Sequence, residues 1–433
     1  GFAWDPLGAA WMSVAGIRQL AQFGGTLALS GVMVLVGGGV WLLVKPGVAR
    51  GERIVGGLLV AAIAITGLAS TFIVRDHYYP DNPRVYAIQP NIGQDQKYVA
   101  DAQERHLRAY LDMTAAALAA DRLDDAVVAA PAETPPQGNA AVDTETAVKN
   151  VAEAAAPLTD APGAPALPTA KAMSSTSFAR AHPETGGAII VWSESAVPYA
   201  VEEDPAIRAR LAAVLGPADL LLFGGVAVIR DSAGEVTALT NSLFVLDAKG
   251  KIHGRYDKSH LVPLGEYVPA RPLMTRLGLA RLAPGDIDFL PGPGPRTLAL
   301  PGFPAVGVQI CYEIIFPGAV VDASNRPGWI VNISNDAWFG PSGPPQHLAQ
   351  ARLRAIEEGL PVVRATPTGI SAIIDGHGNI IASQAAGTVG VAAERLPPAL
   401  PATLFARFGH ATTAVFALLL LIIAFATDRS RRI

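Results

Sequence analysis

Residues 305–313 read Ala-Val-Gly-Val-Gln-Ile-Cys-Tyr-Glu, a mostly apolar run that ends at Cys311, the only cysteine of the chain. Such a run predicts a strand buried on both faces, as in sheets that lie between other layers. A residue directly after the strand projects from the carboxyl end of the sheet, where α/β proteins usually bind ligands. If a helix begins there, its dipole is expected to lower the thiol pKa. Cys311 is therefore a candidate nucleophile, although a lone cysteine can also be an inert core residue.

Much of the remaining chain alternates predicted strands with predicted helices. The predicted strands cover residues 84–89, 187–192, 219–229, 241–246, 251–256, 305–310 and 329–333. One helix is expected at 103–113, and another begins at Gln346 and ends at Gly359. Turn residues predict hairpins across 247–250 and 375–378. This mixture favours an α/β sandwich built in layers.

Two ionisable residues occupy the same kind of position as Cys311, at the exit of a predicted strand. Glu194 follows the strand at 187–192, and Lys258 follows the strand at 251–256. Each residue alone is more simply interpreted as a solvated surface charge. Together, Glu194, Lys258 and Cys311 supply a base, a cation for an oxyanion and a nucleophile.

The composition excludes some classes of protein. With 50% hydrophobic residues and 16% charged residues over 433 positions, the chain is too apolar to be wholly soluble. A net charge of -4 lacks the excess of Lys and Arg expected of a nucleic-acid binder. The eight histidines have no recognisable metal-ligand spacing, and no phosphate-binding glycine-rich loop is present. We therefore expect no nucleic-acid partner, metal or cofactor.

Three stretches lack charged residues for about the 20 residues that a helix needs to cross a bilayer, namely 19–44, 54–74 and 408–427. The basic segments 45–53 and 428–432 adjoin them, and the positive-inside rule makes both segments cytoplasmic. The intervening chain is then expected on the outer side of the membrane. The alternative is that these runs are core helices of a soluble protein.

This topology predicts three regions. They are a transmembrane region at 1–79 with helices at about 20–44 and 54–74, a catalytic domain at 80–407, and a C-terminal transmembrane helix at 408–428. Because the chain opens at Gly1 without an initiator Met, we expect it to be a fragment that lacks earlier helices.

Residues 115–177 contain no aromatic side chain and are dominated by Ala, Pro, Asp, Thr and Glu. Such a segment buries too little apolar surface to offset the entropy of ordering it. We predict a flexible low-complexity insertion at about 115–180, without a catalytic part.

Five segments occur in an order that resembles the nitrilase, or carbon-nitrogen hydrolase, superfamily, and more closely its membrane branch, the apolipoprotein N-acyltransferases. The segments are residues 84–92, 192–194, 256–269, 310–313 and 332–340. The chain departs from the family pattern at Ser193, where proline is usual, at Pro367, where asparagine is common, and in the insertion. The resemblance implies a nitrilase-like αββα sandwich attached to a helical transmembrane region.

The resemblance also implies an acyl transfer in two steps, with Glu194, Lys258 and Cys311 as the catalytic triad. The acyl donor is expected to be a phospholipid, and the acceptor the N-terminal amine of a lipoprotein's diacylglyceryl-cysteine. The enzyme is expected to be a monomer in the bacterial inner membrane, with its catalytic domain on the periplasmic side. A catalytic domain anchored at this surface meets lipid substrates at membrane concentration.

Further residues match the family's supporting positions. Glu266 is expected to orient Lys258, and Glu313 to line the acyl site, with a structural ion pair as the alternative for either. Tyr312 and Asn241 are weaker candidates, with roles in packing and in hydrogen bonding at a strand end. Trp338 is expected to be buried in the core.

Two other functions remain open from the sequence alone. A membrane-tethered amidase would use the same three residues to hydrolyse a small carbon-nitrogen substrate. A scaffold with an inactive nitrilase fold would need no catalytic residues, and the intact triad argues against it.

Overall fold

The computed structural model describes residues 6–69, 79, 81–93, 102–129, 187–263, 265–267 and 289–432. Residues 1–119 and 185–433 form one compact unit, and residues 120–184 form another. All of the candidate site residues belong to the first unit.

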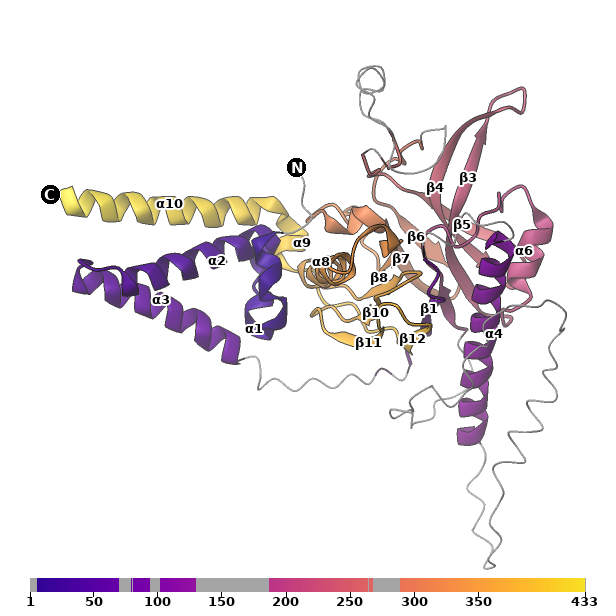
Figure 1. The fold of residues 1–433 in the computed structure, drawn as a ribbon, viewed down its shortest axis with the longest axis horizontal. Helices are drawn as coiled ribbons and strands as arrows, with labels where there is room; N and C mark the ends of the chain where they lie inside the picture. Colours follow the sequence, from indigo (N-terminus) through magenta and orange to yellow (C-terminus); the bar gives the residue numbers. More distant parts are fainter. Residues whose placement is uncertain are drawn as a thin grey trace, which may run out of the picture. The chain divides into compact units, whose positions relative to one another are not determined.

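The first sheet has six strands in the order β12-β1-β2-β3-β4-β5. Its long strands β3 and β4 lie side by side (Figure 1). Its strands are β1 (Arg84–Gln89), β2 (Ile189–Val191), β3 (Leu220–Arg230), β4 (Val236–Asp247), β5 (Ile252–Asp257) and β12 (Gly390–Arg395). The pairs β1/β2 and β2/β3 are parallel, and the remaining pairs are antiparallel.

The second sheet also has six strands, in the order β11-β10-β9-β8-β7-β6. Its strands are β6 (Thr297–Leu300), β7 (Phe303–Ile310), β8 (Trp329–Ile333), β9 (Val362–Ala365), β10 (Ser371–Ile374) and β11 (Ile380–Gln384). Here β7, β8 and β9 are parallel, with antiparallel strands on both sides. In each sheet three parallel strands therefore end along the same edge, where polar side chains that follow them can meet.

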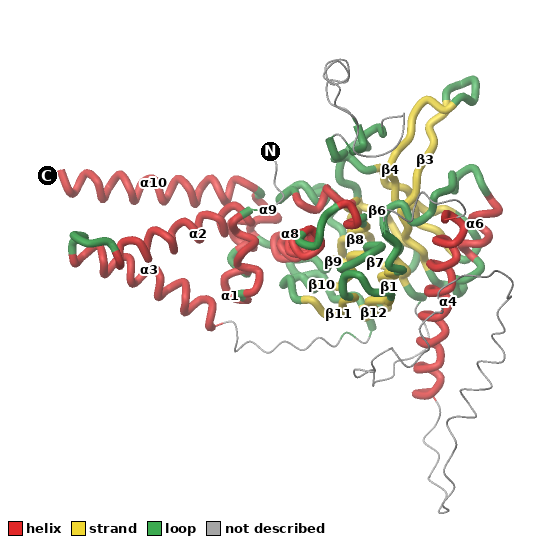
Figure 2. Tube along the Cα trace, viewed as in Figure 1, coloured by secondary structure: helices red, strands yellow, loops and turns green. Residues whose placement is uncertain are grey.

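Alternating side chains of the strands are buried on opposite faces. In β8, Val331 packs in the core between the two sheets, whereas Ile330 packs on the outer side against α8 (Gly343–Glu358). In β1, Val85 belongs to the core between the sheets, and Ile88 packs with α4 (Ala102–Ala129) and α6 (Pro205–Ala212). Helices thus cover the outer face of each sheet (Figure 2). The predicted α/β sandwich is confirmed.

Several elements differ from the prediction. The short strands β6, β9 and β12 were not predicted, because each is brief and carries little periodic pattern. Helix α4 continues to Ala129, so the predicted flexible insertion does not begin at 115. Alanine has the highest helix propensity, and an absence of aromatic residues does not oppose a helix. The rest of the predicted insertion, from 130, lies outside the described residues.

Two helices of the described part of the chain are long and apolar enough to cross a membrane. They are α2 (Ala21–Val44) and α3 (Arg50–Ala69). The apolar part of α10 (His410–Arg432) spans His410–Ile422 and is shorter. The short helices η1 (Leu7–Ser13), α1 (Ala15–Arg18) and α9 (Leu404–Phe408) complete this region.

Helix α2 contacts Phe405 and the end of α8 at a kink. Gly25 has a φ of 69° and lies so close to Phe405 that an added Cβ would be 2.3 Å from its ring. The helix resumes at Thr26, whose backbone N and Oγ1 donate to Glu357 Oε1 at 2.6 and 2.7 Å. Glu357, at the end of α8, also forms a buried ion pair with Arg354 at 2.8 Å. A carboxylate from another helix therefore caps the resumed α2.

Replacing Glu357 by alanine is expected to lower the free energy of unfolding by about 3–5 kcal/mol, since it leaves a buried guanidinium without its carboxylate. Denaturant unfolding in detergent micelles measures this loss. The same change at Glu235, which is exposed, is the control and is expected to stay within about 0.5 kcal/mol of wild type. Equal stability of the two variants would contradict the prediction.

Candidate active site

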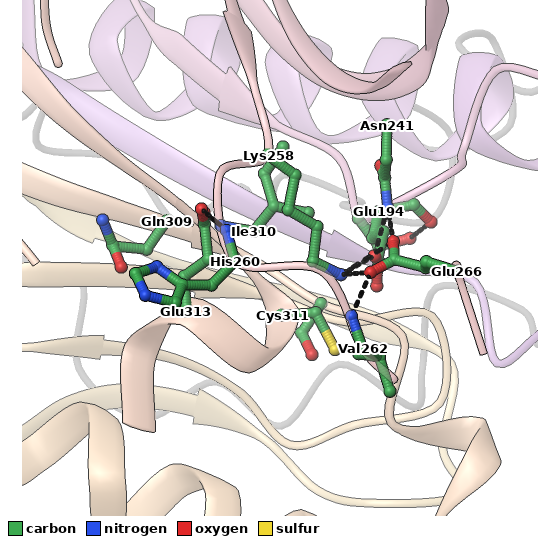
Figure 3. A network of polar contacts seen from close by, with 12 residues as sticks. Glu194, Asn241, Lys258, His260, Val262, Glu266, Gln309, Ile310, Cys311 and Glu313 are labelled. Atoms are coloured by element: carbon green, nitrogen blue, oxygen red, sulfur yellow. Dashed lines mark hydrogen bonds and ion pairs between the residues drawn. The ribbon is translucent and has the colours of Figure 1, made fainter. Parts of the chain in front are cut away.

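Three strands of two different sheets place the three predicted catalytic side chains together. Glu194 follows β2, Lys258 follows β5, and Cys311 follows β7. The Lys258 Nζ lies 3.2 Å from Glu194 Oε1 and 3.0 Å from Glu266 Oε1. Figure 3 shows the lysine amine directed at both carboxylates, with the Cys311 sulfur below them.

Asn241 also belongs to this group of side chains. Its Nδ2 donates to Glu194 Oε1 at 2.8 Å and to Glu266 Oε1 at 2.7 Å (Figure 3). Its backbone oxygen accepts a hydrogen bond of 2.8 Å from the Lys258 N-H. Asn241 lies in the middle of β4, so the predicted role at a strand end was wrong. Its amide holds the two carboxylates around one ammonium group.

Lys258 is buried, with 1% of the residue's surface exposed. Burial alone lowers the pKa of a lysine, but the carboxylates of Glu194 and Glu266 outweigh it and raise the pKa of Lys258 well above its ordinary value. Lys258 therefore keeps its positive charge beside Cys311. A buried fixed cation is suited to stabilise an oxyanion.

The loop that carries Glu194 packs tightly against β3. A Cβ at Gly224 would lie 2.7 Å from the Glu194 Cα, so only glycine allows this approach. Ser193 Oγ lies 2.5 Å from the hydroxyl of Tyr110 on α4. This contact restrains the loop from the side of the helix.

Cys311 opens a 3-10 helix of five residues, η5 (Cys311–Ile315), and has a φ of 50°. Burial, together with the carboxylate of Glu194, raises the pKa of the thiol to about 12 against the lowering effect of Lys258. The prediction of a lowered pKa was wrong, because a single short turn contributes little dipole and the site is desolvated. The resting thiol is protonated and requires a base when substrate binds.

The pattern of the carbon-nitrogen hydrolase family matches residues 136–400. An apolipoprotein N-acyltransferase of Caulobacter vibrioides is 32% identical over 435 residues, which cover 97% of this chain and 68% of the relative. The chain belongs to the apolipoprotein N-acyltransferase family. The resemblance seen in the five sequence segments is thereby confirmed.

Two further apolipoprotein N-acyltransferases are more similar over a shorter range. The protein of Bradyrhizobium diazoefficiens is 43% identical over 238 residues, or 54% of this chain and 44% of the relative. The protein of Rhodopseudomonas palustris is 41% identical over 243 residues, or 56% of this chain and 45% of the relative. The chain thus matches less than half the length of these two relatives.

Among solved structures, an amidase from Nesterenkonia sp. is similar with a TM-score of 0.43 and 15% identity, over 75% of this chain and 93% of the amidase.

The supporting residues that the resemblance to apolipoprotein N-acyltransferases implied fall into two groups. Glu266 contacts Lys258, and its Oε2 accepts a hydrogen bond of 2.8 Å from the Val262 N-H. Glu313 instead is buried behind the site. It accepts hydrogen bonds from the Tyr256 hydroxyl at 2.8 Å, from the backbone N and Oγ of Ser259 at 2.6 and 2.7 Å, and from the backbone N-H groups of His260 at 3.1 Å and Ile310 at 2.7 Å.

These five hydrogen bonds give Glu313 a structural role, and its predicted place at an acyl site stays a prediction. Its carboxylate joins the loop after β5 to the turn at Cys311. Tyr312 packs edge-on against Phe316, with ring centroids 5.0 Å apart. Trp338 is 45% exposed, so its predicted burial was wrong. It ends the short 3-10 helix η6 (Asp336–Trp338), whose buried residue is Asp336.

Sequence reasoning missed a cluster of buried polar side chains near Cys311. It is formed by Asp336, His347 and Arg364. Asp336 lies in one of the five segments, but nothing in the sequence brings His347 and Arg364 to it. Within the described ranges, no three His, Cys, Asp or Glu side chains are placed to hold a metal ion.

Alkylation of Cys311 by iodoacetamide is expected to accelerate with pH beyond pH 9 and up to about pH 12, because the raised pKa keeps the thiolate scarce below that value. The chain has one cysteine, so mass spectrometry assigns the product directly. N-acetylcysteine is the control and should level off above about pH 9. A plateau for the protein below pH 8 would contradict the raised pKa.

Proposed function

We propose that the protein carrying this chain transfers a fatty acyl group from a phospholipid to the N-terminal amine of a lipoprotein's diacylglyceryl-cysteine. The observation that carries the proposal is the buried ammonium of Lys258, held by Glu194 and Glu266 beside the Cys311 thiol, in a chain of the apolipoprotein N-acyltransferase family. Glu194, Lys258 and Cys311 are the proposed catalytic residues.

In the first step, Glu194 accepts the Cys311 proton and the sulfur attacks the ester carbonyl carbon of the phospholipid. The Lys258 ammonium stabilises the oxyanion of the tetrahedral intermediate. When the intermediate collapses, the ester C-O bond breaks and the leaving oxygen takes the proton from Glu194. Lysophospholipid departs and the acyl group remains on Cys311 as a thioester.

In the second step, the lipoprotein amine attacks the thioester carbonyl and loses its proton to Glu194. The C-S bond breaks, the amide is released, and the thiolate of Cys311 regains its proton from Glu194. The thioester retains enough free energy to acylate an amine, so the two steps require no nucleotide. The raised pKa of the resting thiol fits this scheme, because Glu194 is needed to remove its proton.

The membrane topology is part of the proposal. Residues 1–79 form a transmembrane region with α2 and α3, residues 80–407 the catalytic domain, and residues 408–428 a returning helix. The cations at 45–53 and 428–432 favour a cytoplasmic position for both segments, which puts the catalytic domain on the periplasmic side. The apolar lengths of α2 and α3 and the Thr26 contact with Glu357 support this arrangement. We propose that the enzyme acts as a monomer.

The experiment supplies purified protein with phosphatidylethanolamine and a synthetic diacylated lipopeptide in detergent. The expected result is a lipopeptide heavier by one acyl chain, together with an equal amount of lysophospholipid. A lipopeptide whose amine is acetylated is the matched control and should gain no acyl chain. Release of ammonia from small amides without any acyl transfer would overturn the proposal in favour of a membrane-tethered amidase.

A further inference from the structure

A cluster of buried polar side chains lies behind Cys311 and takes no part in the steps above. Its members are Asn332, Ser334, Asp336, His347 and Arg364, each with 1% or less of its surface exposed. They come from β8, from the segment after it, from α8 and from β9. Burying so many polar groups is costly unless they serve one another as partners.

Asp336 is the centre of this cluster. Its Oδ1 accepts a hydrogen bond of 2.6 Å from the Ser334 hydroxyl and lies 2.9 Å from His347 Nδ1. Its Oδ2 pairs with the guanidinium of Arg364, which also bonds Asn332. Burial raises the pKa of Asp336, but Arg364 and His347 outweigh it and hold the pKa well below its ordinary value. Asp336 is therefore an ionised carboxylate, and it bonds the imidazole ring of His347 when Nδ1 is protonated.

The other nitrogen of this ring reaches the nucleophile. His347 Nε2 lies 3.1 Å from the backbone oxygen of Cys311. The Cys311 carbonyl and the ionised Asp336 carboxylate can only accept, so both contacts are hydrogen bonds at once only in the protonated ring. A neutral ring with its proton on Nε2 keeps the bond to Cys311 and accepts at Nδ1 from Arg364 Nη2 at 3.2 Å. Either state gives the same hydrogen bond to Cys311.

The backbone of Cys311 needs such support. Its φ of 50° lies in the left-handed region, which a residue with a Cβ disfavours. Two buried side chains hold the backbone on either side of it. Glu313 Oε2 accepts from the Ile310 N-H at 2.7 Å, and His347 donates to the Cys311 carbonyl. The direction of this carbonyl fixes the turn and hence the direction of the sulfur.

We propose that His347, oriented by Asp336 and Arg364, is a positioning residue that holds the Cys311 carbonyl and so keeps the sulfur beside Lys258 and Glu194. Ser334 supports this arrangement, because its hydroxyl bonds Asp336 and its side chain also hydrogen-bonds the thiol. The proposal rests on the proposed function only for its acyl-transfer measurement. Its second measurement, alkylation of Cys311, needs no lipid substrate.

The test compares His347→Gln with His347→Leu. The glutamine Nε can donate to the Cys311 carbonyl, and leucine of similar bulk cannot. Leucine is expected to slow both thioester formation and iodoacetamide alkylation about 30- to 100-fold, the usual cost of a misplaced reacting group. Glutamine should restore both rates to within about fivefold of wild type. Equal rates for the two variants would overturn the proposal.

A double-mutant cycle separates positioning from a general loss of structure. If His347 acts by placing the sulfur beside Lys258, His347→Leu should slow alkylation by only about threefold or less in a Lys258→Met background. The same full loss in both backgrounds would overturn the proposal. Ile356→Ala, a buried change elsewhere on α8, is the control that lowers stability but should leave alkylation unchanged.

The two measurements also distinguish this proposal from the proposed function. Absence of any lipid thioester, with the expected pattern of alkylation rates, would overturn acyl transfer and leave the role of His347 supported. Normal alkylation in His347→Leu would overturn the role of His347 whatever the acyl donor.

Discussion

The Lys258→Met variant is expected to form the acyl thioester about 10²- to 10³-fold more slowly than the wild type, because it loses a fixed donor to the oxyanion. The amine that it removes lies 3.2 Å from Glu194 Oε1 and 3.0 Å from Glu266 Oε1. Its loss also leaves two carboxylates around Asn241 without their cation. Rapid quenching followed by intact-mass measurement gives the rate.

Lys249→Met is the matched control, since Lys249 is exposed on the turn between β4 and β5. It is expected to keep the wild-type rate. Thermal unfolding of both variants shows whether a slow rate reflects lost structure. Wild-type thioester formation in a folded Lys258→Met protein would exclude Lys258 from the chemistry.

The Glu194→Gln variant is expected to lose about 10²- to 10⁴-fold in thioester formation, the usual contribution of a general base. Glutamine keeps the shape and can still accept through its oxygen from Asn241 and Lys258. Because the Glu194 carboxylate raises the pKa of the Cys311 thiol, removing its charge lowers that pKa. Alkylation of Cys311 at pH 9 should therefore be at least as fast as in the wild type.

Loss of a general base is expected to slow thioester formation at Cys311 without slowing alkylation of the same sulfur. A mere distortion of the site would slow both reactions. Glu203→Gln, a change in an exposed carboxylate paired with Arg230, is the control and should alter neither rate. Equal losses of alkylation and acyl transfer in Glu194→Gln would contradict the assignment.

The sequence was sufficient to predict the parts of the fold that depend on local pattern. The strand before Cys311 and the strand at 329–333 are mostly apolar, and such runs suit strands buried on both faces. Gly359 has left-handed backbone angles and ends α8 at the residue where the sequence predicts the end of the helix. Strand-exit positions also pointed to Glu194, Lys258 and Cys311 without any knowledge of the sheets.

The contacts that complete the site depend on pairing between distant segments. Asn241 is a polar residue within a strand, and only the register of β3, β4 and β5 shows that it faces two carboxylates. His347 lies on a helix where polar residues normally face water, yet the helix packs this side chain against Cys311. The pKa of the Cys311 thiol was mispredicted for a related reason. Burial raises this pKa, and the burial of Cys311 follows only from how the layers assemble.

The most direct test of the proposed chemistry is the intact mass of the purified protein after incubation with phosphatidylethanolamine, for the wild type beside Cys311→Ala. We predict a mass increase of one fatty acyl group on the wild type, removed by hydroxylamine, and no increase on Cys311→Ala. A folded wild-type protein without an adduct, or an adduct on Cys311→Ala, would contradict the thioester on Cys311.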